Sequence, residues 1–195
     1  MKLYIIRHGE TEASPKGLLL GRTDMPLSSI GKEKILSLVR SGIYPDKSLF
    51  SIFATSELQR TYDTLQLIYD NINAVKLPEL NEYDFGDFEL KSPLSLNNDR
   101  DFILWSENPY KYYPPNGENA KAFTNRITKA LMILKHLSDN GNVFLVWHGV
   151  AMDSLYSMLF HTPNMSHFPQ CGHGFIIDID IDNDSIVNAK FIGSI

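Results

Sequence analysis

Two short stretches of the chain are apolar throughout and then stop abruptly at cationic or imidazole side chains. Residues 3–6 end at Arg7 and His8, and residues 143–147 end at His148. A strand with apolar side chains on both of its sides belongs in the middle of a sheet whose two faces are covered by helices. Both stretches are therefore predicted to be central strands of such a sheet.

Strand-like and helical patterns alternate along most of the chain, which predicts an α/β fold: a three-layer sandwich with a mostly parallel central sheet and helices on both faces. Ligands of such sheets bind beyond the carboxyl ends of the strands, so Arg7, His8 and His148 are expected to meet in one crevice. In chain order the other patterns predict a helix between Ser28 and Gly42, a strand at 49–54, a helix from Thr55 to Tyr69, helices at 120–137 and 150–160, and a terminal hairpin of residues 175–181 and 186–192.

Residues 81–119 have a different character. This stretch is rich in Asn, Asp and Tyr and contains four prolines. Proline removes a backbone donor and interrupts regular elements, so we expect an irregular, partly helical cap here. The length of 195 residues suits one core. We therefore interpret residues 1–195 as a single domain with a cap insertion at about 81–119.

Charge and cysteine content exclude several classes of function. With 18 Lys+Arg against 23 Asp+Glu, the net charge of -5 offers no broad attraction to nucleic acid or anionic lipid. No apolar run approaches the roughly 20 residues that span a bilayer, and the start of the chain is too short for a signal peptide. Cys171 alone forms no internal disulfide. We expect a cytoplasmic protein with a small anionic ligand and no nucleic-acid or membrane partner.

His8 stands between an arginine and a glycine at the end of the first predicted strand. The guanidinium fork of Arg7 matches two phosphate oxygens, and Gly9 lets backbone N–H groups approach an anion closely. A neutral imidazole, with an ordinary pKa of about 6.5, is a nucleophile near neutral pH. The pattern indicates attack of His8 on phosphorus; the alternative is a histidine that only caps a loop.

Two further signals indicate an anion site. Ser56 and Arg60 lie four residues apart at the predicted start of a helix, where anions are favoured, although an arginine there is often only a solvated surface residue. His148 is followed by glycine, as His8 is, and it too comes at the end of a central strand. Two His-Gly pairs, each at the end of a central strand, favour one shared site over coincidence.

Six motifs follow one another along the chain. They are Arg7-His8-Gly9-Glu10-Thr11, Gly21-Arg22-Thr23-Asp24-Met25-Pro26-Leu27, Ser56-x-Leu58-x-Arg60-x-x-x-Thr64, Leu80-Asn81-Glu82 with Phe85-Gly86-Asp87-Phe88-Glu89, Asn116-Gly117-Glu118, and His148-Gly149. Together they resemble the ordered motifs of the histidine phosphatase superfamily, whose members have the phosphoglycerate-mutase-like fold, and the resemblance runs nearly from end to end.

The resemblance implies a role for each matching residue. His8 would be the nucleophile that forms a phosphohistidine. Glu82 would be the general acid that protonates the leaving oxygen and then the base that activates water. Arg7, Arg60 and His148 would hold the phosphoryl oxygens, so neither a metal nor another cofactor is expected.

The roles of several neighbouring residues stay more open. Ser14 stands where the family usually has an asparagine that donates to the phosphate, and a serine hydroxyl reaches less far. Thr11 and Thr23 are further candidates to line the phosphate pocket. Glu10 and Glu118 are predicted either to orient the pocket residues or only to form ion pairs.

One further cluster of residues raises the alternative of a zinc site. His161, His167, Cys171 and His173 lie close together in the sequence. Their spacing fits no common zinc-binding pattern, and they fall in a loop with two prolines. No metal site is therefore predicted.

The region from Leu90 to Asn116 bears on the substrate. Its only cations are Lys91, Arg100 and Lys111, which is too little charge to hold the second phosphate of a bisphosphoglycerate. A phosphatase of a small-molecule phosphate monoester is therefore favoured over a phosphoglycerate mutase.

The motifs are similar in particular to those of the α-ribazole phosphatases of cobalamin synthesis, which implies α-ribazole 5′-phosphate as the substrate. Trp105, with Tyr110, Tyr112 and Tyr113, is a candidate to stack on its flat base, although aromatic residues in a cap often only pack together. The alternatives are a phosphatase with broad specificity for sugar phosphates and other phosphoesters, and an inactive relative that only binds them. A homodimer is left open.

Overall fold

The computed structural model describes residues 1–162 and 168–195, and within them the chain forms one sheet of six strands with five α-helices. The strands are β1 (Lys2–Arg7), β2 (Ile52–Thr55), β3 (Val75–Lys76), β4 (Val143–Trp147), β5 (Gly174–Asp182) and β6 (Ser185–Ser194). The helices are α1 (Ser29–Arg40), α2 (Gln59–Ile68), α3 (Arg100–Glu107), α4 (Ala120–Ser138) and α5 (Gly149–Phe160), with 3-10 turns η1 (Ser14–Lys16), η2 (Lys47–Leu49), η3 (Pro78–Leu80) and η4 (Gly86–Phe88).

The strand order is β3-β2-β4-β1-β5-β6. The first four of these strands run parallel, whereas β5 and β6 form an antiparallel hairpin that continues the sheet beyond β1. Strands β1 and β4 lie side by side at the centre, and every residue of β4 is fully buried. The predicted α/β architecture with a mostly parallel sheet and two central strands is confirmed.

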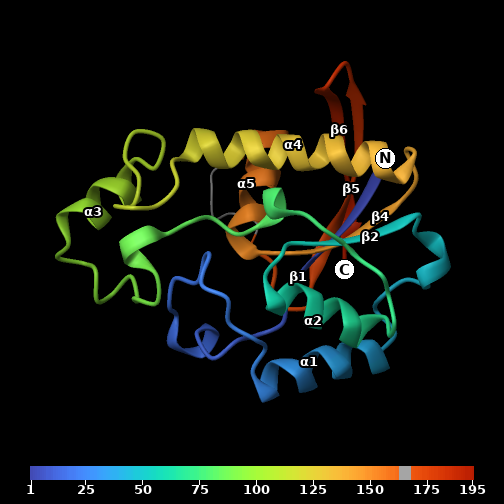
Figure 1. The fold of residues 1–195 in the computed structure, drawn as a ribbon, viewed down its shortest axis with the longest axis horizontal. Coiled ribbons are helices and arrows are strands. Elements are labelled where there is room, and N and C mark those ends of the chain that lie inside the picture. Colours follow the sequence, from blue (N-terminus) through green and yellow to red (C-terminus); the bar gives the residue numbers. More distant parts are fainter. Residues whose placement is uncertain (163–167) are drawn as a thin grey trace.

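Helices cover both faces of the sheet, as Figure 1 shows: α1 and α2 lie on one face, and α4 and α5 lie on the other. Side chains alternate along a strand, so Leu3 and Ile5 of β1 pack toward α4 and α5, while Ile6 packs toward α1 and α2. Full burial of an aliphatic side chain of this size contributes about 1.5–3 kcal/mol. The two cores fix β1 and β4 firmly beneath the polar residues that follow them.

Most predicted boundaries agree with the structure. Helix α1 begins where predicted, because the side chain of Ser28 accepts a hydrogen bond from the N–H of Gly31, and it ends just before Gly42, which has a φ of +73°. Helix α4 and the terminal hairpin differ from their predicted bounds by one or two residues.

Two predictions were wrong in their bounds. Strand β2 begins at Ile52 instead of residue 49, because Asp46 caps the turn η2 just before it. Helix α2 begins at Gln59 instead of Thr55: the hydroxyl of Ser56 accepts a hydrogen bond from the N–H of Leu58, which keeps this segment outside the helix. Ser56 and Arg60 are therefore not on one helical face.

Residues 81–119, interpreted as a cap, contain η4 and α3 and lie at one end of the molecule (Figure 1). The two ends of this stretch are joined at its base: the N–H of Asp87 donates to Pro115, and the N–H of Glu118 donates to Asp84. Gly86 has a φ of +49°, and a Cβ there would lie 2.1 Å from the oxygen of Pro115. Only glycine fits this close contact. Among the described helices, none is long and apolar enough to cross a membrane.

Candidate active site

His8 and His148 follow the two central strands and lie next to each other. Arg7 pairs with Trp147 in the β1–β4 register, and the N–H of His8 donates to the carbonyl of Trp147 at 2.9 Å. The two imidazole rings stand edge to face with their centroids 5.2 Å apart. The sheet thus brings together two residues that are 140 positions apart in the sequence.

The imidazole of His8 is held in one tautomer. Its Nδ1 lies 2.7 Å from the carbonyl oxygen of Gly9, and an N–H at this position donates to that oxygen. The N–H of Gly9 in turn donates to the hydroxyl of Thr64 at 2.9 Å. Burial and the nearby charge of Arg60 lower the pKa of His8 well below its ordinary value. His8 is therefore neutral at pH 7, with a bare Nε2 that is able to act as a nucleophile.

The guanidinium of Arg60 is fully buried and fixed by a loop. Its two terminal nitrogens donate to the carbonyls of Gly21, at 2.7 Å, and Thr23, at 3.0 Å. Burial lowers the pKa of Arg60 to about 10, and nearby carboxylates, Glu82 first, oppose this shift. Arg60 consequently remains charged at neutral pH.

The side chain of Arg7 is oriented by the segment that follows residue 167. One terminal nitrogen donates to the carbonyl of Pro169 at 3.0 Å, and the guanidinium lies 4.4 Å from the ring centre of Phe168. A Cβ on Gly149 would clash with this ring at 2.3 Å and would approach Nε of Arg7 to 3.2 Å. A glycine after His148 is thus required for Arg7 and Phe168 to pack as they do.

His148 is fully buried and bonded to a chain of hydroxyl groups. Its Nε2 lies 2.8 Å from Oγ of Ser56, which lies 2.9 Å from Oγ1 of Thr61, whose hydroxyl donates to the carbonyl of Leu58 at 2.8 Å. Burial, and then the charge of Arg60, lower the pKa of His148 well below its ordinary value. With Nε2 engaged, the other ring nitrogen, Nδ1, is available to a ligand.

Three buried nitrogens around His8 have no hydrogen-bond partner among the described residues: Nε of Arg7, Nε of Arg60 and Nδ1 of His148. Buried polar groups are nearly always hydrogen-bonded in native proteins. The charges of Arg60 and Arg7 both lower the pKa of His8, so two cationic groups lie near the nucleophile. Such an arrangement suits an anion with several oxygens. Arg7, Arg60 and His148 are referred to below as the phosphate cradle.

Glu82 is almost fully buried, and its carboxylate accepts three backbone hydrogen bonds. Oε1 accepts from the N–H groups of Tyr83 and Ala151, and Oε2 accepts from that of Val150, all at 2.9–3.0 Å. Burial raises the pKa of Glu82 above its ordinary value, although these bonds act in the opposite direction. Oε2 accepts only one of the three bonds, so it keeps a lone pair for a proton. A carboxyl group of this kind is suited to act as a general acid and base.

Arg126 of α4 holds the backbone that carries Glu82. Its guanidinium donates to the carbonyls of Glu79, Asn81 and Glu82. These three bonds all go to the main chain, so Arg126 positions the acid through its backbone.

Glu10 and Glu118 both form ion pairs. Glu118 binds Arg126 through both oxygens, at 2.7 and 2.8 Å, in a largely buried pair. Glu10 binds Lys34 at 2.5 Å near the surface. Of the two roles predicted for these residues, the geometry favours ion pairing over direct orientation of the cradle.

The other predicted pocket residues form bonds within their own loops. The hydroxyl of Ser14 accepts from the N–H of Thr11, and that of Thr11 accepts from the N–H of Ala13. Thr23 contributes its carbonyl, not its side chain, to Arg60. The structure therefore brings His8, Arg7, Arg60, His148 and Glu82 together, whereas the side chains of Ser14 and Thr11 serve the local loop.

The zinc alternative gains no support where the structure describes it. His167 lies outside the described residues. Within residues 1–162 and 168–195, no group of three or more His, Cys, Asp or Glu side chains is arranged to hold a metal ion.

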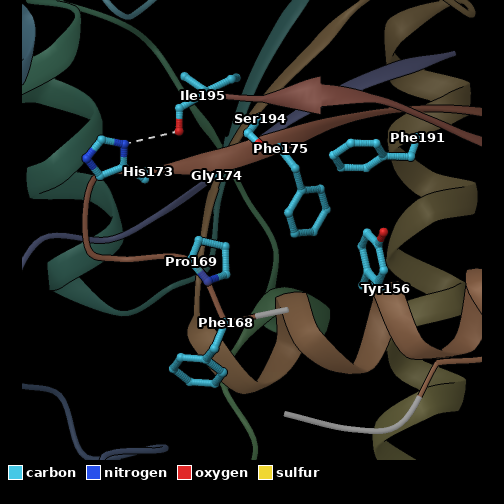
Figure 2. Close-up of a pocket in the computed structure, with 9 residues that line it drawn as sticks. All are labelled: Tyr156, Phe168, Pro169, His173, Gly174, Phe175, Phe191, Ser194 and Ile195. Carbon is cyan, nitrogen blue, oxygen red and sulfur yellow. Dashed lines mark hydrogen bonds between the residues drawn. The ribbon is translucent and has the colours of Figure 1, made fainter. Parts of the chain in front are cut away.

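A cavity of about 370 Å³ shares two residues with the surroundings of Arg7. Phe168 and Pro169 line it, and Figure 2 shows that aromatic rings, including Phe175, occupy much of its remaining wall. Among the described residues that line it there is no acid, lysine or arginine. We therefore assign the anion site to the buried cluster around His8 and not to this apolar cavity.

Sequence reasoning assigned no role to Thr64, Glu89 or Arg126, although all three support the site. Thr64 follows Arg60 by four residues, so both lie on one face of α2. That spacing could have indicated from the sequence that Thr64 lies near the site. Glu89 binds backbone N–H groups of residues 21–23, and no local pattern indicates so distant a contact.

Comparison with known proteins identifies the family of the chain. Residues 3–189 match the family model described as histidine phosphatase superfamily (branch 1). An adenosylcobalamin/alpha-ribazole phosphatase of Salmonella typhimurium is 34% identical over 177 residues, which are 86% of this chain and 85% of that protein. The corresponding Escherichia coli protein is 29% identical over 205 residues, covering 99% and 98%. The crystal structure of the alpha-ribazole phosphatase from Shigella flexneri superposes with a TM-score of 0.81 at 28% identity, covering 99% of this chain and 95% of the other.

Proposed function

The chain belongs to branch 1 of the histidine phosphatase superfamily, and from this premise we propose that it is a metal-independent phosphomonoesterase that acts through a phosphohistidine at His8, with α-ribazole 5′-phosphate as its substrate. The observation that carries the proposal is the cluster of three unpartnered buried nitrogens, on Arg7, Arg60 and His148, around a histidine whose Nε2 is bare.

The first step transfers the phosphoryl group to the enzyme. Nε2 of His8 attacks phosphorus while the bond from phosphorus to the ester oxygen breaks, and its electrons pass to that oxygen. Glu82 gives its proton to the leaving oxygen, which departs as an alcohol. The proton on Nδ1 of His8 stays on that nitrogen and keeps its hydrogen bond to the carbonyl of Gly9, so the ring keeps its orientation.

The second step returns the enzyme to its starting state. The carboxylate of Glu82 takes a proton from water, and the water oxygen attacks phosphorus. The bond from phosphorus to Nε2 of His8 breaks, and its electrons return to the ring nitrogen. Inorganic phosphate leaves, and Glu82 is again protonated. One residue thus serves as acid and then as base.

The phosphate cradle lowers both barriers. A transferring phosphoryl group spreads negative charge over three equatorial oxygens. Arg7, Arg60 and His148 are fixed in advance by Pro169, by the loop at residues 21–23 and by Ser56, so no reorganisation is needed when that charge develops. The guanidinium groups of Arg7 and Arg60 supply the positive charge that a metal supplies in other phosphatases, and His148 adds a neutral imidazole.

Two observations support the choice of substrate. The relatives named above carry alpha-ribazole phosphatase in their names and are similar over most of both chains. The three cations of the cap, Lys91, Arg100 and Lys111, are all exposed, and this argues against a second phosphate site and therefore against a mutase.

One observation favours a second candidate, a phosphomonoesterase of broad specificity. Trp105, predicted to stack on the base of the substrate, instead packs among the aromatic rings of the cap, with Tyr83 stacked at 6.1 Å and Phe85 and Phe102 at 5.9 and 5.7 Å. Simple packing therefore accounts for Trp105. A stacking role in the cap is left to tyrosines such as Tyr110, which is well exposed.

The experiment compares substrates and variants in the presence of EDTA. Phosphate release is measured for α-ribazole 5′-phosphate, a set of sugar phosphates, phosphoserine and 3-phosphoglycerate, with wild type and His8→Ala. We expect turnover that EDTA does not change, the highest kcat/KM with α-ribazole 5′-phosphate, and none with His8→Ala. Similar kcat/KM across the set would favour broad specificity, and isomerised 3-phosphoglycerate would indicate a mutase. No turnover of any ester would leave an inactive phosphoester-binding relative.

A further inference from the structure

Glu89 receives a set of contacts that its position in the sequence does not explain. Its carboxylate accepts hydrogen bonds from three consecutive backbone N–H groups: Arg22 at 2.7 Å, and Gly21 and Thr23 at 3.2 Å each. Three converging N–H groups form an anion-binding concavity. In this protein a carboxylate of the same chain fills it, so residues 21–23 are held in one conformation.

The same loop holds Arg60 from its other side. The carbonyls of Gly21 and Thr23 accept the two terminal nitrogens of the buried guanidinium. The N–H groups of residues 21–23 thus face Glu89, while two of their carbonyls fix the plane of Arg60. The orientation of that plane decides where the unpartnered Nε of Arg60 lies relative to the other two cradle residues, Arg7 and His148.

The contact requires glycine at position 21. A Cβ there would lie 2.1 Å from the carbonyl oxygen of Tyr83 and 2.3 Å from Oε1 of Glu89. Both distances are far below any real contact of a Cβ atom. The close approach of the carboxylate to the loop therefore depends on two residues, Glu89 and a glycine at position 21.

Neighbouring bonds fix the loop relative to Glu89. Leu19 and residues 90–91 exchange two backbone hydrogen bonds, at 2.8 and 2.9 Å. At the far end of the loop, the carboxylate of Asp24 accepts from the N–H of Gln59, the first residue of α2. The loop is thus anchored on the cap side by Glu89 and on the α2 side by Asp24.

We infer that Glu89 is a positioning residue of the phosphate cradle: through the loop at residues 21–23 it sets the orientation of Arg60, and it does not touch the substrate itself. The inference rests on the proposed function, because it assigns Arg60 to phosphate binding. Glu89 also adds negative charge near Arg60 and so favours its charged form, after Glu82 and Asp24.

The test measures phosphate binding separately from turnover. The affinity for inorganic phosphate is determined by isothermal titration calorimetry, and kcat and KM are determined with p-nitrophenyl phosphate. Glu89→Gln keeps one acceptor oxygen but loses the charge and turns an NH2 group toward the loop. We expect phosphate to bind at least about 10-fold more weakly and KM to rise by a similar factor, whereas Glu89→Asp should restore part of both.

Asp87→Asn is the matched control. Asp87 lies two residues away, is exposed and binds only the side-chain amide of Asn116 and the carbonyl of Pro115 in the described geometry. This variant removes one negative charge from the same segment without touching the loop, so its phosphate affinity and KM should equal those of wild type.

A double-mutant cycle with Arg60→Lys distinguishes positioning from general destabilisation. If Glu89 acts through Arg60, Glu89→Gln should weaken phosphate binding little or not at all once Arg60 is replaced. Wild-type phosphate affinity in a folded Glu89→Gln or Glu89→Asp protein, or full additivity in the cycle, would overturn the inference. If wild type binds phosphate but hydrolyses no ester, the proposed function fails while the binding comparison still tests Glu89.

Discussion

The carboxylate of Glu82 caps α5, the helix that follows His148. His148 is the N-cap residue of α5, yet its side chain makes no capping bond. The N–H groups of Val150 and Ala151, in the first turn, donate instead to Glu82. A helix N-terminus leaves such groups without intrahelical partners. Glu82, which precedes the two residues by 68 and 69 positions, satisfies them. The imidazole of His148 is therefore not needed for capping and can bond Ser56 through Nε2, and the proposed acid is fixed relative to it.

Replacing Glu82 by glutamine should separate the two chemical steps. p-Nitrophenolate leaves without a proton, so phosphorylation of His8 should proceed in Glu82→Gln, while hydrolysis of the phosphohistidine, which needs a base, should slow by about 10² to 10⁴. Rapid-mixing measurements should show a burst of about one p-nitrophenolate per enzyme. An alkyl phosphate, whose leaving oxygen needs the proton, should give no burst.

The same variant allows the intermediate to be isolated. With a ³²P-labelled aryl phosphate, Glu82→Gln should retain acid-labile, base-stable label, and peptide mapping should locate it at His8. The absence of both burst and label in a folded Glu82→Gln protein would argue that Glu82 acts before the phosphohistidine forms or that no such intermediate exists.

The pH dependence of kcat/KM should follow the opposite pKa shifts of the two catalytic groups. His8 must be neutral, and because its pKa is lowered well below its ordinary value, protonation of His8 should reduce activity only well below pH 6.5. Glu82 must be protonated, and its pKa is raised above the ordinary value of 4.5, so activity should fall as the pH rises through that raised pKa.

We therefore expect kcat/KM to fall at low pH through protonation of His8 and at high pH through ionisation of Glu82. The second ionisation of the ester, near pH 6, affects every variant equally, so the profile of Glu82→Gln serves as the control. That profile should lack the decline that wild type shows toward high pH. If kcat/KM of the variant declined toward high pH as it does in wild type, that decline would belong to a group other than Glu82.

The sheet and its central strands were predictable because the signals are local. An apolar run of four or five residues followed by a polar step identifies β1 and β4, and amphipathic spacing identifies α1 and α4. The start of α2 was not predictable, since the side chain of Ser56 accepts a bond from the backbone of Leu58 and keeps residues 56–58 outside the helix. Helix propensity does not show when a side-chain hydrogen bond to the backbone competes with the helix.

The site divides in the same way. His8, Arg60 and His148 follow strand ends or open a helix, and their motifs mark them. The support of the site is non-local: Glu89 reaches a loop more than 60 residues away, and Arg126 reaches backwards from α4 to the carbonyl of Glu82. Almost every residue has a backbone carbonyl and N–H group, so no sequence pattern predicts which of them will bind a distant side chain such as Glu89 or Arg126.

Ser56→Ala should weaken catalysis through His148. The variant removes the partner of Nε2, 2.8 Å away in a fully buried site, and leaves the ring without orientation. The loss of one buried hydrogen bond that leaves its partner unsatisfied costs about 1–3 kcal/mol, which corresponds to roughly 5- to 150-fold in kcat/KM. Thr61→Val, which only shortens the hydroxyl chain, should have a smaller effect in the same assay.

A purely structural role of Ser56 predicts a different result. In that case Ser56→Ala would lower the melting temperature but leave kcat/KM and phosphate affinity unchanged at a temperature where the protein is folded. His148→Gln provides the reference. If Ser56 acts through His148, adding Ser56→Ala to His148→Gln should reduce kcat/KM little further.

Arg126 is predicted to contribute more to stability than its neighbour Lys129, although both lie on α4 and both bind the segment at residues 79–82. The pair of Arg126 with Glu118 is largely buried, with exposed side-chain fractions of 14% and 12%, whereas Lys129, paired with Glu79, is 67% exposed. Breaking a buried pair on one side costs about 3–5 kcal/mol because the remaining charge is left without a partner. An exposed pair is worth about 0–1 kcal/mol.

Arg126→Met should accordingly lower the free energy of unfolding in urea by about 3–5 kcal/mol, and Lys129→Met by less than about 1 kcal/mol. The carbonyls of Glu79, Asn81 and Glu82 also lose their donor in Arg126→Met, so Glu82 should become less well positioned and kcat should fall in the fraction that remains folded. Equal losses of stability in the two variants would contradict this assignment, because they would mean that burial of the guanidinium does not set its contribution.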